Sequence, residues 1–156
     1  MALGMMCASM PSGAQTEKPV LSAQESDPVR MGWMQGFPPL KDRQLRFPDG
    51  SFFEFPAMRS SVVHMIEFKP VVSISRGVRA PEPLPYRLDP RIDVIAFRPT
   101  NADTDMTWEE SLWQNYTDGI VILHQGRIVH ERYFGALAAD RRHDAMSVTQ
   151  SFTGTL

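Results

Sequence analysis

Proline placement is the feature that most limits how this chain can fold. All 13 prolines lie between Pro11 and Pro99, and residues 100–156 contain none. Proline fixes the backbone angle φ and lacks an amide hydrogen, so a proline-rich stretch forms neither long helices nor central strands. We therefore expect three parts: a disordered start (residues 1–26), a proline-rich extended arm (27–106) and the start of a folded domain (107–156).

Composition narrows the class of protein further. The chain has 156 residues, of which 42% are hydrophobic and 22% charged, with a net charge of −2, as in an ordinary globular domain. Cys7 is the one cysteine, which excludes a disulfide framework. No apolar run approaches the roughly 18 residues of a membrane-spanning helix, and the charge offers no surface for nucleic acid. We expect neither a membrane nor nucleic acid as a partner. Because no basic leader is present, we expect a cytoplasmic location.

Within the arm, short apolar stretches alternate with proline and turn signals. Residues 52–55 follow an Asp49-Gly50 turn signal, and residues 61–66 and 71–75 are rich in valine and isoleucine. These features predict extended segments separated by turns, followed by a polyproline-like linker over residues 81–85. His64 lies in one apolar stretch and is expected to be a packed core histidine.

The last third has the signals of regular structure. Thr107 and Glu110 fit a capping box, which predicts a helix of about ten residues that stops at Asp118-Gly119. Residues 119–123 and 127–134 predict a β-hairpin around a Gln125-Gly126 turn. The first of these strands is apolar on both faces, so we expect cover on both sides of its sheet and additional strands. The fold class expected is α+β.

Ser147 is the candidate nucleophile, because it lies at the start of a predicted helix directly after the hairpin. There its hydroxyl would lie beside free backbone amides that stabilise an oxyanion. In S-x-x-K hydrolases a lysine three residues later accepts the hydroxyl proton. Gln150 occupies that position here, and an amide has no usable basicity near neutral pH. Ser147 and Gln150 equally fit an S-x-x-Q capping box with no catalytic role.

No sequence motif indicates a cofactor or a phosphate-binding loop. His124 and His130 flank the hairpin turn without a third ligand nearby, so no metal site is expected.

Two stretches of the last third closely resemble the β-lactamase-related serine hydrolases: TDGIVILHQGRIVHERYFG (residues 117–135) and MSVT (146–149). The arm stretches MGWMQGFPP (31–39) and DGSFFEFP (49–56) look like the 6-aminohexanoate-dimer hydrolases, also called nylon-oligomer hydrolases, within that superfamily. The resemblance implies a β-lactamase/transpeptidase-like fold, here incomplete: the arm, one helix, the first hairpin and the start of the nucleophile helix. It also implies hydrolysis of a small linear amide or short-chain ester through a serine acyl-enzyme, without metal or cofactor.

On this resemblance Ser147 matches the family's nucleophile, and Gln150 stands where the family has its general-base lysine. The family also uses a tyrosine from a Y-x-N motif and a later strand motif, and none of Tyr86, Tyr116 and Tyr133 has that context. We therefore expect the amino-terminal portion of such a hydrolase, inactive as it stands, with a substrate only if a missing lobe completes it.

Two alternatives remain open. The chain could be a non-catalytic pseudoenzyme or interaction protein whose hairpin edge pairs with another chain. It could also be one part of an enzyme whose other lobe is a second polypeptide. In all three cases unpartnered apolar surface is expected to make the isolated chain marginally stable or aggregation-prone.

Overall fold

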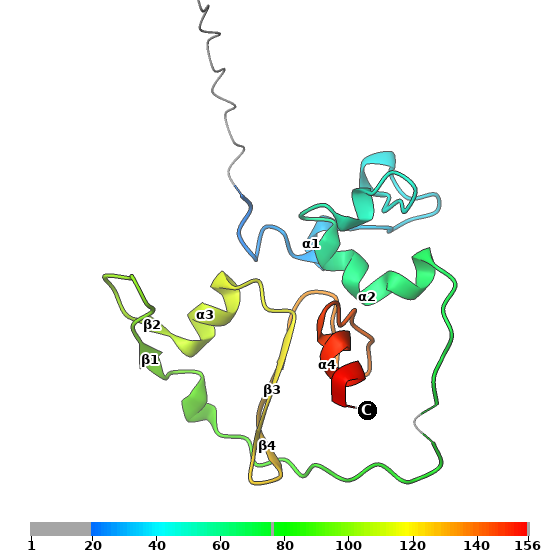
Figure 1. Ribbon diagram of the computed structural model, residues 1–156. Helices are drawn as coiled ribbons and strands as arrows, with labels where there is room; N and C mark the ends of the chain where they lie inside the picture. Colours follow the sequence, from blue (N-terminus) through cyan, green and yellow to red (C-terminus); the bar gives the residue numbers. More distant parts are fainter. Residues whose placement is uncertain (1–19, 76, 156) are drawn as a thin grey trace, which may run out of the picture.

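The computed structural model describes residues 20–75 and 77–155 as a mixture of short helices and small antiparallel sheets (Figure 1). This is the α+β class expected from the sequence. The helices are α1 (Pro28–Met31), α2 (Met58–Phe68), α3 (Trp108–Gln114) and α4 (Val148–Thr155), with 3-10 turns at Lys41–Arg43, Ser51–Phe53 and Pro90–Ile92. The strands are β1 (Ala96–Phe97), β2 (Met106–Thr107), β3 (Gly119–His124) and β4 (Arg127–Tyr133). No helix in the described residues is long and apolar enough to cross a membrane.

The start of the chain is only partly described. Cys7 and the rest of residues 1–19 lie outside the described residues. Residues 22–26, which we expected to belong to the disordered start, instead form a hydrogen-bonded turn in which Ala23 and Ser26 are buried.

The predicted hairpin is confirmed. Strands β3 and β4 pair antiparallel, and one extra residue of β4 forms a bulge where the register shifts between Ile122 and Leu123. Gln125 and Gly126 connect the strands with φ of 50° and 72°. Positive φ at both central residues is the backbone of a type I′ turn, which matches the twist of the two strands.

A third segment pairs with β4, and it comes from the arm. Residues 85–89, which we call the strap, run parallel to β4: the Ile128 amide donates to Pro85 O at 3.0 Å, and the Arg87 and Asp89 amides donate to Ile128 O and Val129 O at 2.8 and 2.9 Å. Pro85 accepts a bond here and is not required to donate one. The sheet of β3 and β4 remains two-stranded in the described residues, without the additional strands expected, and the strap adds only an isolated parallel bridge to it.

Helix α3 begins as predicted and ends earlier. Thr107 and Glu110 form both hydrogen bonds of the capping box. The helix ends at Gln114 because the amides of Tyr116 and Thr117 donate back to the carbonyls of Trp113 and Leu112 at 3.1 and 3.0 Å. This is a Schellman motif with Tyr116 in the left-handed position at φ 51°. Asp118-Gly119 therefore does not stop the helix.

The predicted extended segments of the arm are not strands. Residues 61–66 lie within α2, an 11-residue helix in the proline-free interval between Pro56 and Pro70. Its buried face includes small polar residues, and the Ser61 hydroxyl is satisfied by the Ala57 carbonyl at 3.2 Å. Residues 51–53 form a 3-10 turn after Gly50, and residues 71–75 pair with no strand of the described chain.

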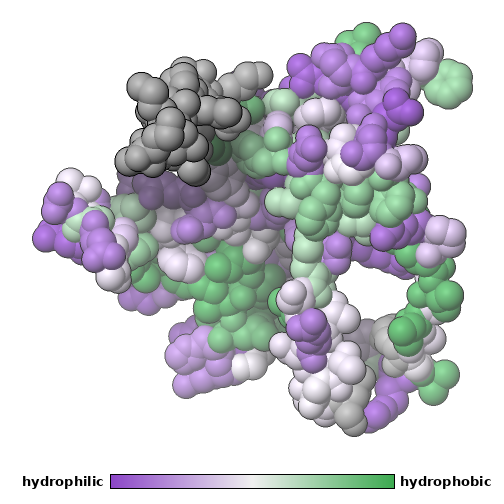
Figure 2. Space-filling view, turned by 45° about the horizontal axis from the view of Figure 1, so that its top comes forward, coloured by the Kyte–Doolittle hydropathy of each residue, from purple (hydrophilic) through white to green (hydrophobic). Residues whose placement is uncertain are grey.

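The buried apolar residues come from the turn at residues 22–26, from the arm with its helix α2, from α3, and from β4 and the residue after it. They are Ala23, Leu45, Ala57, Val62, Val63, Leu112, Ile128 and Phe134. Strand β3 is less covered than expected, because Val121 and Leu123 remain 46% and 53% exposed. Figure 2 shows apolar residues reaching the surface in the centre of its view. Among the described residues, then, β3 has an apolar side that no element covers.

Candidate nucleophile segment

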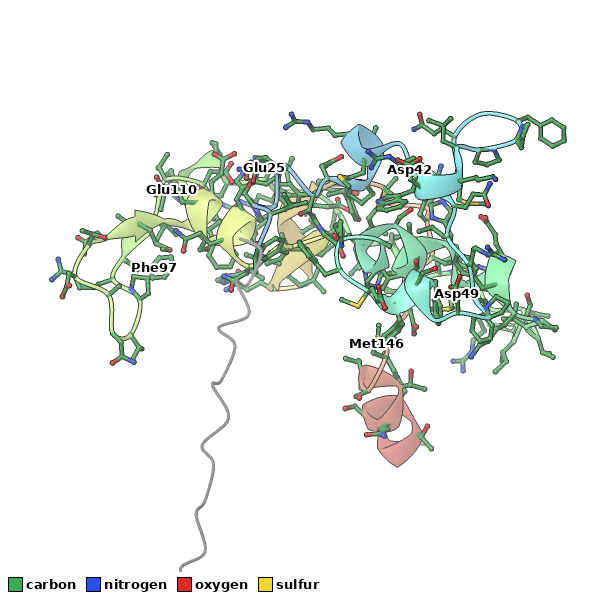
Figure 3. The ribbon with its side chains drawn as sticks, turned by 90° about the horizontal axis from the view of Figure 1, so that it is seen from above. Glu25, Asp42, Asp49, Phe97, Glu110 and Met146 are labelled. Atoms are coloured by element: carbon green, nitrogen blue, oxygen red, sulfur yellow. The ribbon has the colours of Figure 1, made fainter. Side chains whose placement is uncertain are left out.

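Ser147 immediately precedes α4. The helix starts with backbone bonds from the Val148 amide to Ala145 O and from the Gln150 amide to Ser147 O, both 3.0 Å. Met146 has a positive φ of 47°, and its amide donates to Asp144 Oδ1 at 3.0 Å. Figure 3 shows α4 extending away from the other elements, with Met146 near its base. The predicted helix start is confirmed, and the chain turns sharply just before the serine.

The side chains of Ser147 and Gln150 are both exposed. In the described part of the chain, neither the Ser147 hydroxyl nor the Gln150 amide group has a hydrogen-bond partner, so the S-x-x-Q capping box is not formed. A serine hydroxyl is a weak nucleophile until a neighbouring base removes its proton. The geometry therefore presents a serine at a helix start, and over residues 20–75 and 77–155 no hydrogen bond joins its hydroxyl to a base.

The loop before Ser147 is anchored through a buried arginine. Arg59 on α2 donates from Nη1 to Ala23 O at 2.7 Å and to Ser26 Oγ at 3.0 Å. Its Nη2 lies 3.5 Å from Asp118 Oδ1, and the Asp118 Oδ2 lies 3.2 Å from His143 Nε2. The chain Arg59–Asp118–His143 connects α2 and the start of β3 to the loop that precedes Ser147.

Two further bonds extend this anchor. The second ring nitrogen of His143, Nδ1, lies 2.8 Å from Asp144 O, and the Asp144 amide donates to Val62 O on α2 at 2.7 Å. Carboxylate and carbonyl oxygens only accept, so each ring nitrogen of His143 faces an acceptor. The loop is thus fixed to α2 and to β3 three residues before the candidate nucleophile.

No local sequence pattern indicates this cluster. In the sequence, Asp118 fits a helix stop together with Gly119, and no motif includes His143. The partners lie 59 and 25 positions apart in the chain. Only the tertiary fold brings them together.

The histidines at positions 64, 124 and 130 differ in burial and in contacts. His64 is half-buried, and its Nδ1 lies 2.8 Å from Ser60 O. His130 is buried, with Trp108 Nε1 at 3.5 Å and Asp93 Oδ1 at 3.7 Å. His124 is exposed at the end of β3. Over residues 20–75 and 77–155, no three His, Cys, Asp or Glu side chains are grouped so as to hold a metal ion.

Tyr133 and His143 line one depression of about 440 Å³ beside the start of β3. The Tyr133 hydroxyl donates to the Glu131 carboxylate, and this bond raises the pKa of Tyr133 to about 12. A tyrosine that is harder to ionise is a poorer general base. Ser147 is not among the residues that line this depression.

Comparison with known proteins gives a distant likeness to a solved structure. No protein-family model matches the chain. A solved structure described as "Putative 6-aminohexanoate-dimer hydrolase from Bacillus anthracis" is similar over 66% of this chain, with 28% identity and a TM-score of 0.59. The likeness is to a hydrolase. The match covers 26% of that protein, so the matched part of this chain spans about a quarter of its length.

Proposed function

We propose that this chain supplies the nucleophile-bearing part of a serine hydrolase related to 6-aminohexanoate-dimer hydrolase, folded as the first part of a β-lactamase-like lobe. The observation that carries the proposal is the position of Ser147, at a helix start that directly follows a hairpin and its connecting loop. The similarity to a hydrolase structure supports it. The substrate class is a small linear amide or short-chain ester.

We further propose that the chain does not turn over such substrates by itself. In the proposed chemistry the serine oxygen attacks the carbonyl carbon, a base accepts the hydroxyl proton, and that proton passes to the departing amine or alcohol. Gln150 stands where the base belongs and cannot accept the proton. Without general acid–base assistance, a step typically loses about 10²–10⁴-fold in rate.

The test is hydrolysis of 6-aminohexanoate dimer and of p-nitrophenyl acetate by the purified chain. We expect both rates to equal those of Ser147→Ala, and Gln150→Lys alone to restore nothing, because the family's tyrosine and later strand motif are also lacking. Ser151→Ala is the matched control, since Ser151 is an exposed serine on the same helix. Turnover that Ser147→Ala abolishes and Ser151→Ala retains would refute the inactivity.

A second candidate function, as an interaction protein, is favoured by the uneven cover of the hairpin. The strap covers one edge of the two-stranded sheet, whereas among the described residues no strand pairs with the outer edge of β3. Val121 and Leu123 on β3, with Val148 and Phe152 on α4, are exposed apolar side chains. Unpaired strand edges next to apolar surface favour strand addition by a partner.

Light scattering after size exclusion, on material purified from cells, tests the interaction function. A stable, monodisperse complex supports the interaction function. Recovery only as aggregate or proteolysed fragments counts against it.

A further inference from the structure

A basic depression lies where the arm crosses the turn end of the hairpin, a crossing visible at the bottom of Figure 1. Its volume is about 600 Å³. Arg87 and Arg91 line it from the arm, and His124 and Arg127 line it from the hairpin, together with Asp89. This size is within the range of about 300–1,000 Å³ that is typical of small-molecule sites.

Regular backbone pairing sets the positions of these side chains. His124 and Arg127 are directly opposite each other in the hairpin register, so their side chains share one face of the sheet. The strap is fixed to β4 through the amides of Arg87 and Asp89, and residues two apart on an extended segment also share a face. The basic groups are therefore held by hydrogen-bonded backbone, not by a free loop.

The charges in the depression do not cancel. Arg91 holds Asp89 with two parallel bonds, Nε to Oδ1 at 2.8 Å and Nη2 to Oδ2 at 2.6 Å, and this pairing lowers the pKa of Asp89 to about 2. Asp89 is therefore an ionised carboxylate that one arginine already occupies. Arg87 and Arg127 form no ion pair with any carboxylate in the described chain. The charge of Arg87 also acts on Asp89, and the three guanidinium groups and one carboxylate leave the depression with a net charge of +2.

We propose that this depression binds a small polyanion carrying phosphate or paired carboxylate groups. A guanidinium presents a planar fork of donors that matches the oxygens of either group. Neighbouring like charges repel each other, and an anion placed among Arg87, Arg127 and the His124 ring relieves that repulsion. This site is independent of Ser147 and of the proposed hydrolase function.

The test is NMR titration of the full chain with pyrophosphate in one arm and citrate in the other, at constant ionic strength. We expect saturable shifts of amide signals in residues 86–91 and 124–129. Arg127→Gln and, separately, Arg87→Gln are each expected to weaken binding at least tenfold. Saturation by pyrophosphate alone identifies a phosphate site, and saturation by citrate alone identifies a carboxylate site.

Arg98→Gln is the matched control, because it removes the same charge outside the depression. Arg98 pairs with Asp105 at 2.7 Å. The substitution is expected to leave the affinity unchanged. Equal weakening by Arg98→Gln, or the same shifts produced by sodium chloride at equal ionic strength, would overturn the proposal, as would shifts spread over the whole chain. Arg87 and Arg127 are both exposed, so neither substitution removes a packed side chain.

Discussion

Asp118→Asn is the substitution that most directly tests how the loop before Ser147 is held. Asp118 contacts Arg59 with one carboxylate oxygen and His143 with the other. Asparagine keeps the shape and one acceptor but removes the negative charge. The variant therefore leaves the buried Arg59 without its counter-charge and gives His143 an uncharged partner.

The expected loss follows from burial. The side chains of Arg59 and Asp118 are 5% and 20% exposed, so solvent screens their interaction only partly. Removing one partner of a fully buried pair costs about 3–5 kcal/mol. The 3.5 Å separation, the partial exposure of Asp118 and the remaining amide acceptor reduce this, and we expect a loss of about 2 kcal/mol. For a chain of this length that lowers Tm by about 4–8 °C.

Urea unfolding followed by tryptophan fluorescence measures the loss. Asp105→Asn is the matched control, because its pair with Arg98 is 58% and 61% exposed and we expect a loss of at most about 0.5 kcal/mol. Hydrogen exchange of the Asp144 amide, which donates to Val62 O, gives a local measure that does not require cooperative unfolding. Wild-type stability of Asp118→Asn, or equal losses of stability in both variants, would contradict a stabilising role for the buried pair.

Three further predictions concern local structure. Thr107→Ala removes the cap of α3 and is expected to cost about 1 kcal/mol, seen as faster amide exchange in that helix. Gly135→Ala is expected to lower the free energy of unfolding by roughly 1–2 kcal/mol in urea, because Gly135 has φ +59° and a Cβ there would lie 2.9 Å from the ring of Pro28. Gly154→Ala is the control: its Cβ would meet no atom within 4 Å, so the substitution should cost nothing. Folding raises the pKa of Tyr133 to about 12, so its contribution to stability is present below the unfolded value near 10 and is lost as the pH rises through about 12. At about pH 11 the NMR signal of the ring carbon that bears the hydroxyl should still report a protonated Tyr133. Glu131→Gln should shift the ionisation of Tyr133 to lower pH. Ionisation of Tyr133 near pH 10 in the wild type would contradict this prediction.

Local signals predicted the last third of the chain well, because its determinants are close in sequence. The Thr107 and Glu110 side chains are three residues apart, and the Gln125-Gly126 turn joins directly adjacent strands. The end of α3 was not predictable in the same way. Tyr116 occupies a left-handed position that usually favours glycine, and it is held there by distant contacts, including its hydroxyl bond to Leu21 O at 2.6 Å.

The arm was harder to predict, because the apolar residues of its helix α2 do not recur at the spacing of an amphipathic helix. Helix α2 buries serines and an arginine, so the apolar spacing that identifies an amphipathic helix is missing, and Val62-Val63 favours a strand. In the candidate nucleophile segment, too, some features follow from the local sequence and others depend on distant residues. The helix start at Ser147 follows from the sequence, but the cluster that anchors it depends on residues from three distant segments.

The prolines determine which edge of the hairpin remains open. A proline-rich segment can lie along a strand only where its missing amide hydrogens are not needed, and the strap meets this condition by accepting through Pro85 O and donating through Arg87 and Asp89. Because the strap occupies β4, strand addition by a partner or by further chain is left to β3, where Val121 and Leu123 are exposed. The open edge therefore suits both proposed functions. A completed hydrolase lobe and a binding partner could each add a strand along β3. Only the hydrolase needs a base that accepts the proton of Ser147, so such a base separates the two functions more sharply than the open edge does.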